Sequence, residues 1–370
     1  CLMDFHSRYR AICSKVRKRV FRKPNYAEAA ANLGDMVEEL KRECNPHHAA
    51  MVLLSLARCE EALYGKGGSE DVHLFSDAAR LLMNSEVESC ALGQQTSAED
   101  MSQALQCYHF AIEIEEHKGA FSTSANLYKE VGDSLKKLSR FSDAASHLEK
   151  AATLYASELQ FSLALSCSLS AVWCRVADGD HEGACTGLTR LLSQNEEMPS
   201  ASGLSLSAGL GDVDFRESIS IQSRVSIFFL YLILGVSLKA QNTLTELKRY
   251  MSARRRFAIL DGLVAFLEFV MIAFRESDVY SMSCLMEEAS FVLNQDQMSL
   301  FQELRRVLEK PAVLSLFDED PDFLGAGVEE EMEVYQRPVE SVHLSSPGLV
   351  LRNARDCLGE EDCTSPIPGS

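Results

Sequence analysis

Apolar residues recur every three or four positions along most of the chain, which is the spacing of one face of an α-helix. Asn25 precedes one such stripe and is a residue type that caps helix N-termini. The members of that stripe are Ala29, Leu33, Met36, Val37 and Leu40. Pro46 suits the first turn of a second helix, which is expected to end at Gly65. Because no alternating run predicts a strand, the pattern indicates an all-α protein.

The middle of the chain repeats itself every 20 residues. The repeats open at Phe121, Phe141 and Phe161, with His181 on the same phase. Four residues further on stand Ala125, Ala145, Leu165 and Cys185. A helix of about 16 residues plus a short turn occupies roughly 20 positions, so two repeats make one helical hairpin of about 40. Small residues at fixed positions allow neighbouring helices to approach closely.

One stretch also follows the tetratricopeptide pattern of an aromatic residue, Gly, Ala, a large residue and Ala. Its residues are Tyr128, Gly132, Ala144, Leu148 and Ala151. The predicted hairpin is longer than the 34 residues of a tetratricopeptide repeat. We therefore predict a tetratricopeptide-like α-solenoid of stacked antiparallel helical hairpins, with a plain helical bundle as the alternative.

Proline placement suggests the domain boundaries, because proline interrupts helix interiors. No proline occurs between Pro46 and Pro199 or between Pro199 and Pro311. The predicted parts are an N-terminal helical block (1–193) that begins with a basic amphipathic helix, a flexible loop (194–214), a C-terminal helical block (215–310) and an acidic, largely disordered tail (311–370). Within the second block, the apolar segment 260–273 is expected to be buried on most sides.

Composition narrows the function. Hydrophobic residues make up 46% of the 370 residues, enough for a sizeable core, and the net charge of −18 makes nucleic acid a poor partner. The longest apolar run, 225–236, is shorter than the roughly 20 residues that span a bilayer, so no transmembrane segment is expected. The 12 cysteines include no CxxC pair and several lie in helical patterns, which favours the reducing cytoplasm.

Two charged segments are candidates for partner binding. The first carries eight basic residues and no acidic ones, namely Arg8, Arg10, Lys15, Arg17, Lys18, Arg19, Arg22 and Lys23. Apolar residues at helical spacing accompany it, so it is expected to form a helix that docks on an acidic partner, anchors at a membrane surface, or is merely solvated. The second segment lies in the tail and includes Asp318, Glu319, Asp320 and Asp322. It either docks on a partner or is a solvated tail without a role.

No catalytic or metal-binding motif is found. The sequence has no GxSxG, HExxH or GxxxxGK[ST] pattern. Cys44, His47, His48 and Cys59 lie close together in sequence, but they are spread along a predicted helix and zinc needs four convergent ligands. We therefore expect a protein without enzymatic activity and without a cofactor or metal.

Several short segments are distinctive, namely residues 4–10 (DFHSRYR), 15–19, 21–25 (FRKPN) and 27–29, with further segments at 57–59, 62–63 and 78–81. Through these segments the N-terminal region resembles the 40-kDa huntingtin-associated protein family. The resemblance extends over roughly 4–193 and, as a pattern of apolar residues, 257–309. Family members known to us carry a long proline-rich insertion in the middle, where this chain has a short segment with one proline.

This resemblance implies a solenoid that is held between the HEAT-repeat domains of huntingtin and stabilises it. It further implies a link to an early-endosomal Rab GTPase, to vesicle movement along the cytoskeleton, and to cytoplasmic, early-endosomal and nuclear locations. A second interpretation is a vesicle-fusion adaptor similar to the soluble NSF attachment proteins, which also stack helical hairpins. A third is a membrane-surface protein that uses the basic helix.

Overall fold

A computed structural model describes residues 2–16, 24–94, 98–197, 211–252 and 258–309 of the chain. These residues form helices, and no strand occurs among them. The chain divides into two compact units, residues 1–187 and 188–370, with the division inside helix α9 (His181–Glu197). The predicted all-α fold class is thus confirmed, and each unit is described by itself.

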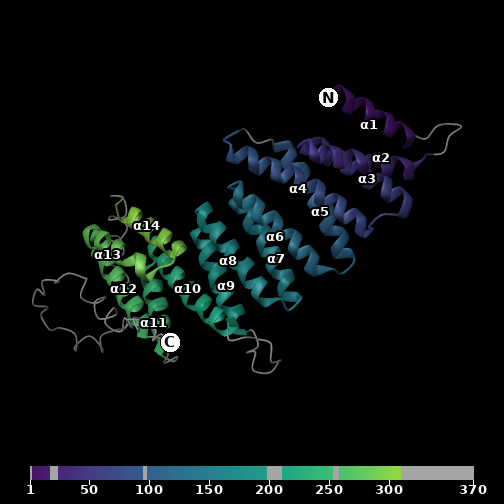
Figure 1. The fold of residues 1–370 in the computed structure, drawn as a ribbon. Helices are drawn as coiled ribbons and strands as arrows, with labels where there is room; N and C mark the ends of the chain where they lie inside the picture. The colour runs from purple at the N-terminus through teal and green to yellow at the C-terminus, as the bar shows by residue number, and fades with distance from the viewer. Residues whose placement is uncertain (1, 17–23, 95–97, 198–210, 253–257, 310–370) are drawn as a thin grey trace, which may run out of the picture. The chain divides into compact units, whose positions relative to one another are not determined.

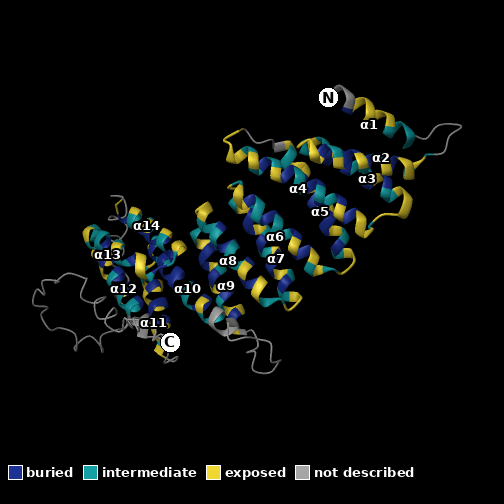
Figure 2. Ribbon diagram, in the orientation of Figure 1, coloured by how far each residue is buried: buried dark blue, intermediate teal, exposed yellow. Residues whose placement is uncertain are grey.

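Unit 1 is a row of helices that pack in sequence order (Figure 1). Its helices are α1 (Leu2–Val16), α2 (Tyr26–Arg42), α3 (Pro46–Tyr64), α4 (Ser69–Ala91), α5 (Ala98–His117), α6 (Phe121–Lys137), α7 (Phe141–Ser157), α8 (Phe161–Asp178) and the start of α9 (His181–Glu197). Each helix turns a buried stripe toward its neighbours and an exposed stripe toward solvent (Figure 2). Asn25 caps α2 by accepting from the Glu28 N–H, as predicted.

The 20-residue repeat corresponds to single helices, as predicted. Helices α6, α7, α8 and α9 begin at Phe121, Phe141, Phe161 and His181. The turns before them repeat too, because Gly119, Ser139, Leu159 and Gly179 all adopt a left-handed conformation, with φ between 57° and 83°. In each turn the next backbone N–H donates at 2.9 Å to a carbonyl five residues earlier, which ends the preceding helix.

Gly132 explains why the tetratricopeptide-like pattern contains a glycine. A Cβ added to this residue would lie 2.6 Å from Cγ of Leu148 and 3.3 Å from the carbonyl oxygen of Ala144. Ala144, Leu148 and Ala151 are almost fully buried. The small side chains therefore let α6 and α7 come into close contact, and Leu148 fills the space beside Gly132.

Side-chain contacts show that the helices of unit 1 lie in two layers. Arg80 of α4 binds Glu130 of α6, and Lys136 of α6 donates to Ser170 of α8, so α4, α6 and α8 lie in one layer. In the other layer a ring nitrogen of His47 in α3 lies 3.5 Å from a carboxylate oxygen of Asp100 in α5. Helices that contact both their hairpin partner and the next helix in the same layer form a helical solenoid.

Unit 2 contains the rest of α9, followed by α10 (Gly211–Ile233), α11 (Ser237–Ser252), α12 (Ala258–Arg275), α13 (Val279–Val292) and α14 (Gln295–Glu309). Its first complete helix, α10, packs against α11 and also against its last helix, α14. The ring of Phe301 lies 5.8 Å from that of Phe229 in α10 and 5.6 Å from that of Phe266 in α12. The contact between first and last helices was not predicted from the sequence.

The structure departs from several expectations in detail. Helix α9 continues to Glu197 and α10 begins at Gly211, so helix extends from both sides into the segment 194–214. In the segment 260–273, Ile272 is 51% exposed, which is more than a helix buried on most sides would show. Residues 198–210 and the acidic tail lie outside the described residues.

Candidate protein-binding surfaces

Helix α1 is held against α2 and α3 by its apolar face. Phe5 is buried there with its ring 4.2 Å from that of His48, and the Tyr9 hydroxyl lies 2.6 Å from the Ser55 hydroxyl. Ile12 and Val16 pack against the same core. A membrane anchor that inserts this face would first have to separate α1 from α2 and α3.

The predicted basic site residues are only partly described. Arg8 forms a bidentate pair with Glu39 at 2.7 and 3.1 Å, and Lys15 pairs with Glu28 at 2.7 Å. The hydrogen bond from Arg8 lowers the pKa of Glu39. Arg10 is exposed. The remaining candidates lie outside the described residues, namely Arg17, Lys18, Arg19, Arg22, Lys23, Asp318, Glu319, Asp320 and Asp322.

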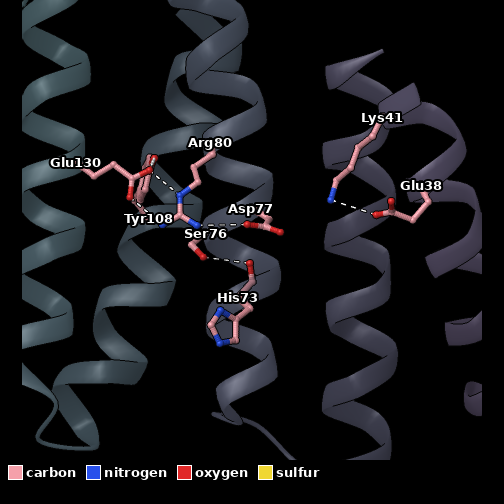
Figure 3. Close-up of polar contacts among 8 residues, drawn as sticks. All are labelled: Glu38, Lys41, His73, Ser76, Asp77, Arg80, Tyr108 and Glu130. Carbon is pink, nitrogen blue, oxygen red and sulfur yellow. Dashed lines mark hydrogen bonds and ion pairs between the residues drawn. The ribbon is translucent and has the colours of Figure 1, made fainter. Parts of the chain in front are cut away.

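A polar network connects three helices of unit 1 (Figure 3). Glu130 of α6 accepts two hydrogen bonds from Arg80 of α4, at 2.6 and 2.9 Å, and one from the Tyr108 hydroxyl of α5 at 2.9 Å. A carboxylate oxygen of Asp77 lies 3.3 Å from the other side of the Arg80 guanidinium. Each of α4, α5 and α6 thus contributes a member, which fixes their relative positions.

The network leaves Glu130 ionised. Burial alone would raise the pKa of Glu130, but the hydrogen bonds from Arg80 and Tyr108 outweigh it and lower that pKa. The hydrogen bond to Glu130 raises the pKa of Arg80. Burial, with the Glu130 charge beside it, raises the pKa of Tyr108. All three groups therefore keep one protonation state near neutral pH, which suits a structural role better than proton transfer.

A second network ties α7 to α8. Arg175 donates to Glu149 at 2.9 and 3.1 Å and to Asp180 at 2.9 Å. Asp180 also accepts from the Gly183 N–H at 2.8 Å, and this backbone hydrogen bond, with the Arg175 charge, lowers the pKa of Asp180. Sequence reasoning missed both networks, because the ion pairs that join different helices connect residues 50 positions apart in the first and 26 in the second.

The sulfur and imidazole groups of the described residues show no catalytic arrangement. His48 Nδ1 lies 2.8 Å from the side-chain oxygen of Asn45, and Cys59 is buried. Among the described residues, no group of three or more His, Cys, Asp or Glu side chains is placed to hold a metal ion. Burial raises the pKa of both Cys107 and Cys167 to about 11, so these thiols stay protonated and unreactive at neutral pH.

The surface of the described helices offers exposed apolar side chains. Over the part of the chain that the structure describes, no helix is both long and apolar enough to cross a bilayer. Several large apolar side chains are nevertheless exposed, chiefly Tyr64, Leu92, Phe110 and Leu159 in unit 1 and Leu238, Tyr280 and Phe291 in unit 2. Surfaces for protein contact are therefore more evident in this structure than a site for chemistry.

Comparison with known proteins confirms the resemblance noted in the sequence. The chain is 31% identical over 191 residues to the 40-kDa huntingtin-associated proteins of Rattus norvegicus and Mus musculus. The match covers 51% of this chain and 49% of each relative, so the chain spans about half the length of the curated relatives it matches. Residues 26–197 match the family model of the soluble NSF attachment protein, SNAP.

Solved structures of helical repeats are also similar. A crystal structure of a kinesin light chain from Podosopora anserina with nearly identical TPR-like repeats aligns with a TM-score of 0.33 and 12% identity. The alignment covers 61% of this chain and 96% of that one. A second crystal structure, of a single-substitution variant of that protein, aligns with a TM-score of 0.33 and 11% identity, covering 63% and 99% of the two chains.

Proposed function

We propose that this chain is a non-enzymatic adaptor that binds huntingtin, a large HEAT-repeat protein, and stabilises it. The observation that carries the proposal is the 31% identity to the 40-kDa huntingtin-associated proteins. It is supported by a helical unit whose charged groups are used to hold helices together, as Arg80, Glu130 and Arg175 are. Exposed apolar residues provide the contact area that such a role needs.

The same proposal extends to cellular context. Bound to huntingtin, the chain would connect that protein to an early-endosomal Rab GTPase and to vesicle traffic along the cytoskeleton. Its locations would then be the cytoplasm, the early endosome and the nucleus. The folded helices, the −18 net charge and the buried, protonated thiols are compatible with the first of these.

Affinity purification from the organism of origin tests the proposal. The full chain carrying a small affinity tag is expected to recover huntingtin in near-equal molar amount, and co-expression is expected to raise the yield of both proteins. Phe5→Ser removes the buried ring that holds α1 against α2 and α3. This variant shows how local damage to the fold affects the recovery of huntingtin. Failure of the wild-type chain to enrich huntingtin over an untagged control would contradict the proposal.

A second candidate function is favoured by one specific observation, the match of residues 26–197 to the SNAP family model. Under this alternative the chain is a vesicle-fusion adaptor that binds SNARE complexes and recruits the NSF ATPase. The same purification distinguishes the two. Recovery of SNARE proteins and NSF without huntingtin would favour the alternative and displace the first proposal.

A further inference from the structure

The hairpin turns of unit 1 lie alternately at its two edges. Because successive helices run in opposite directions, the α3–α4, α5–α6 and α7–α8 turns share one edge (Figure 1). The side-chain contacts agree, since Gln160, just before α8, donates to Ser122 at the start of α6 at 2.9 Å. We call this edge, residues 60–71, 115–122 and 157–163, the acidic edge.

Exposed apolar side chains gather on the acidic edge. Tyr64, the last residue of α3, is 83% exposed, and Leu159, in the α7–α8 turn, is 73% exposed. Phe121 and Leu163 are 39% and 40% exposed at the starts of α6 and α8. All three turns of the edge therefore carry at least one large apolar side chain in contact with water, which marks protein-binding surfaces when it occurs in a group.

Leu159 is unfavourable for the isolated fold in two ways. Its φ of 57° is a left-handed conformation that is unfavourable for a residue with a Cβ. The three corresponding turns carry Gly119, Gly179 and the small Ser139. Its side chain is also mostly exposed and gains little from burial. A leucine at this position is therefore unfavourable for the free chain, and contact with a partner would bury its side chain.

The charge of the edge identifies the kind of partner. Its three segments contain seven acidic residues and only two lysines, Lys66 and Lys118. Asp71 is buried and accepts from the N–H groups of Gly67 and Gly68, and Glu115 pairs with Lys118, which leaves five carboxylates beside Lys66. Burial raises the pKa of Glu60, and the nearby charges of Glu70 and Asp71 raise it further. A partner segment with basic side chains would relieve this repulsion.

The same charge argues against two other occupants. An anionic lipid surface would be repelled by the excess of acidic over basic residues on this edge. Two copies of the chain joined through this edge would bring the same carboxylates together. We infer that the acidic edge of unit 1 binds a basic, amphipathic helix of a partner protein.

The dimensions suit this partner. Neighbouring helices in one layer lie about 10 Å apart, so the α3–α4 and α7–α8 turns are separated by roughly 20 Å. A helix of about 14 residues has this length. Its apolar face would cover Tyr64, Phe121 and Leu159, while lysines or arginines along its flanks would meet Glu61, Glu70 and Glu158.

Matched variants test the apolar contribution. Tyr64→Ser with Leu159→Ser removes the two most exposed apolar groups of the edge, and serine suits the second position because Ser139 adopts the same φ of 57°. The control is Leu92→Ser, since Leu92 is 74% exposed in the α4–α5 turn at the opposite edge. Thermal melting should show that both proteins remain folded.

A second pair of variants tests the charge. Glu61→Lys with Glu158→Lys reverses two carboxylates at helix C-termini, where a positive charge favours the helix dipole, so the fold should not suffer. The control, Glu88→Lys with Asp178→Lys, makes the same change at the C-termini of α4 and α8 on the opposite edge. Net charge changes equally in both proteins.

The first readout uses huntingtin, because the inference rests on the proposed function. Both edge variants are expected to bind at least ten-fold more weakly than wild type, with the controls within about three-fold. Carbodiimide coupling, which joins carboxylates to amines, should link the edge to huntingtin lysines. If huntingtin binds but edge and control variants behave alike, the inference is wrong and the proposed function stands.

The second readout is independent of huntingtin. The probe is a fluorescent 18-residue peptide with leucines on one helical face and lysines on the other, compared with a version carrying glutamates. Fluorescence anisotropy should show that the basic peptide binds and that the edge variants weaken it ten-fold more than their controls. Equal weakening of peptide binding by the edge variants and by the control variants would overturn the inference. So would edge variants that lose binding to vesicles or lose dimers. These outcomes count whether or not huntingtin binds.

Discussion

The two units are built from helices of similar length but bury their apolar faces differently. In unit 1, packing joins helices that are neighbours in sequence or one helix apart, as between α4 and α6. In unit 2, α10 packs against α14, and Gln297 donates to the carbonyl of Gln222, 75 residues away. Unit 1 is an open stack, whereas unit 2 closes on itself.

This difference has consequences for stability and for binding. In an open stack each helix depends mainly on its neighbours, so damage is expected to remain local. In a closed bundle the last helix completes the core around the first, so damage should spread through the unit. An open stack also carries a row of turns along each edge, such as the acidic edge. A small closed bundle is too short for such a row.

The largest loss of stability is expected from a change in the core of unit 2. Phe301→Ala removes the buried ring that contacts Phe229 and Phe266, and should reduce the free energy of unfolding of unit 2 by about 3–5 kcal/mol. Hydrogen exchange measured by mass spectrometry should show α10 to α14 losing protection together. Loss confined to α14 would mean that the unit is not cooperative.

A change inside the open stack should remain more local. Gly132→Leu places a side chain where a single Cβ would already lie 2.6 Å from Leu148, and should cost about 1–3 kcal/mol. Exchange should accelerate in α6 and α7 and hardly at all in α2 and α3. Equal acceleration throughout unit 1 would contradict the comparison, and Gly34→Leu, with open space around its Cβ position, is the control.

The polar network should contribute less. Glu130→Gln removes the charge that Arg80 and Tyr108 bind, and should cost about 1–2 kcal/mol at pH 7. Because the folded pKa of Glu130 is lowered, its contribution is complete above the unfolded pKa of about 4.3 and is lost as pH falls through the folded pKa.

Urea titrations at pH 7 and at pH 3 measure this difference. The gap in stability between wild type and Glu130→Gln should narrow at the lower pH. Asp77→Asn, at the more exposed end of the network, should cost under about 1 kcal/mol. A gap that is constant with pH would show that the carboxylate charge is not what stabilises the stack.

The smallest expected change in stability is an increase. Leu159→Gly relieves the left-handed leucine and should stabilise unit 1 by about 0.5–1 kcal/mol, raising its melting temperature by a few degrees. Gly179→Leu in the next turn should lower it by a similar amount. Destabilisation by Leu159→Gly would mean that the leucine side chain supports the fold after all.

The sequence predicted unit 1 better than unit 2, and the reason is physical. Helix boundaries at Phe121, Phe141 and Phe161 follow from a local repeat, and Gly132 is explained by contacts within one hairpin. The Phe229–Phe301 contact joins helices far apart in sequence and leaves no periodic signal. Apolar periodicity shows that a face is buried but does not identify the helix that covers it.

The candidate site was predictable only in part. The pattern of α1 revealed its two faces, but not that Arg8 and Lys15 already bind Glu39 and Glu28 of the same chain. The acidic edge brings together three segments, none of which stands out in the sequence. Only the alternation of helix direction places the exposed apolar residues of these segments at one edge.

Hydrogen exchange of the full chain, free and in complex with huntingtin, tests the central claim most directly. The account predicts that the turns and helix ends of the acidic edge in unit 1 gain protection, while α10 to α14 exchange at unchanged rates. Protection gained only in α10 to α14, or equally across both units, would contradict the claim that the open stack is the binding part of the molecule.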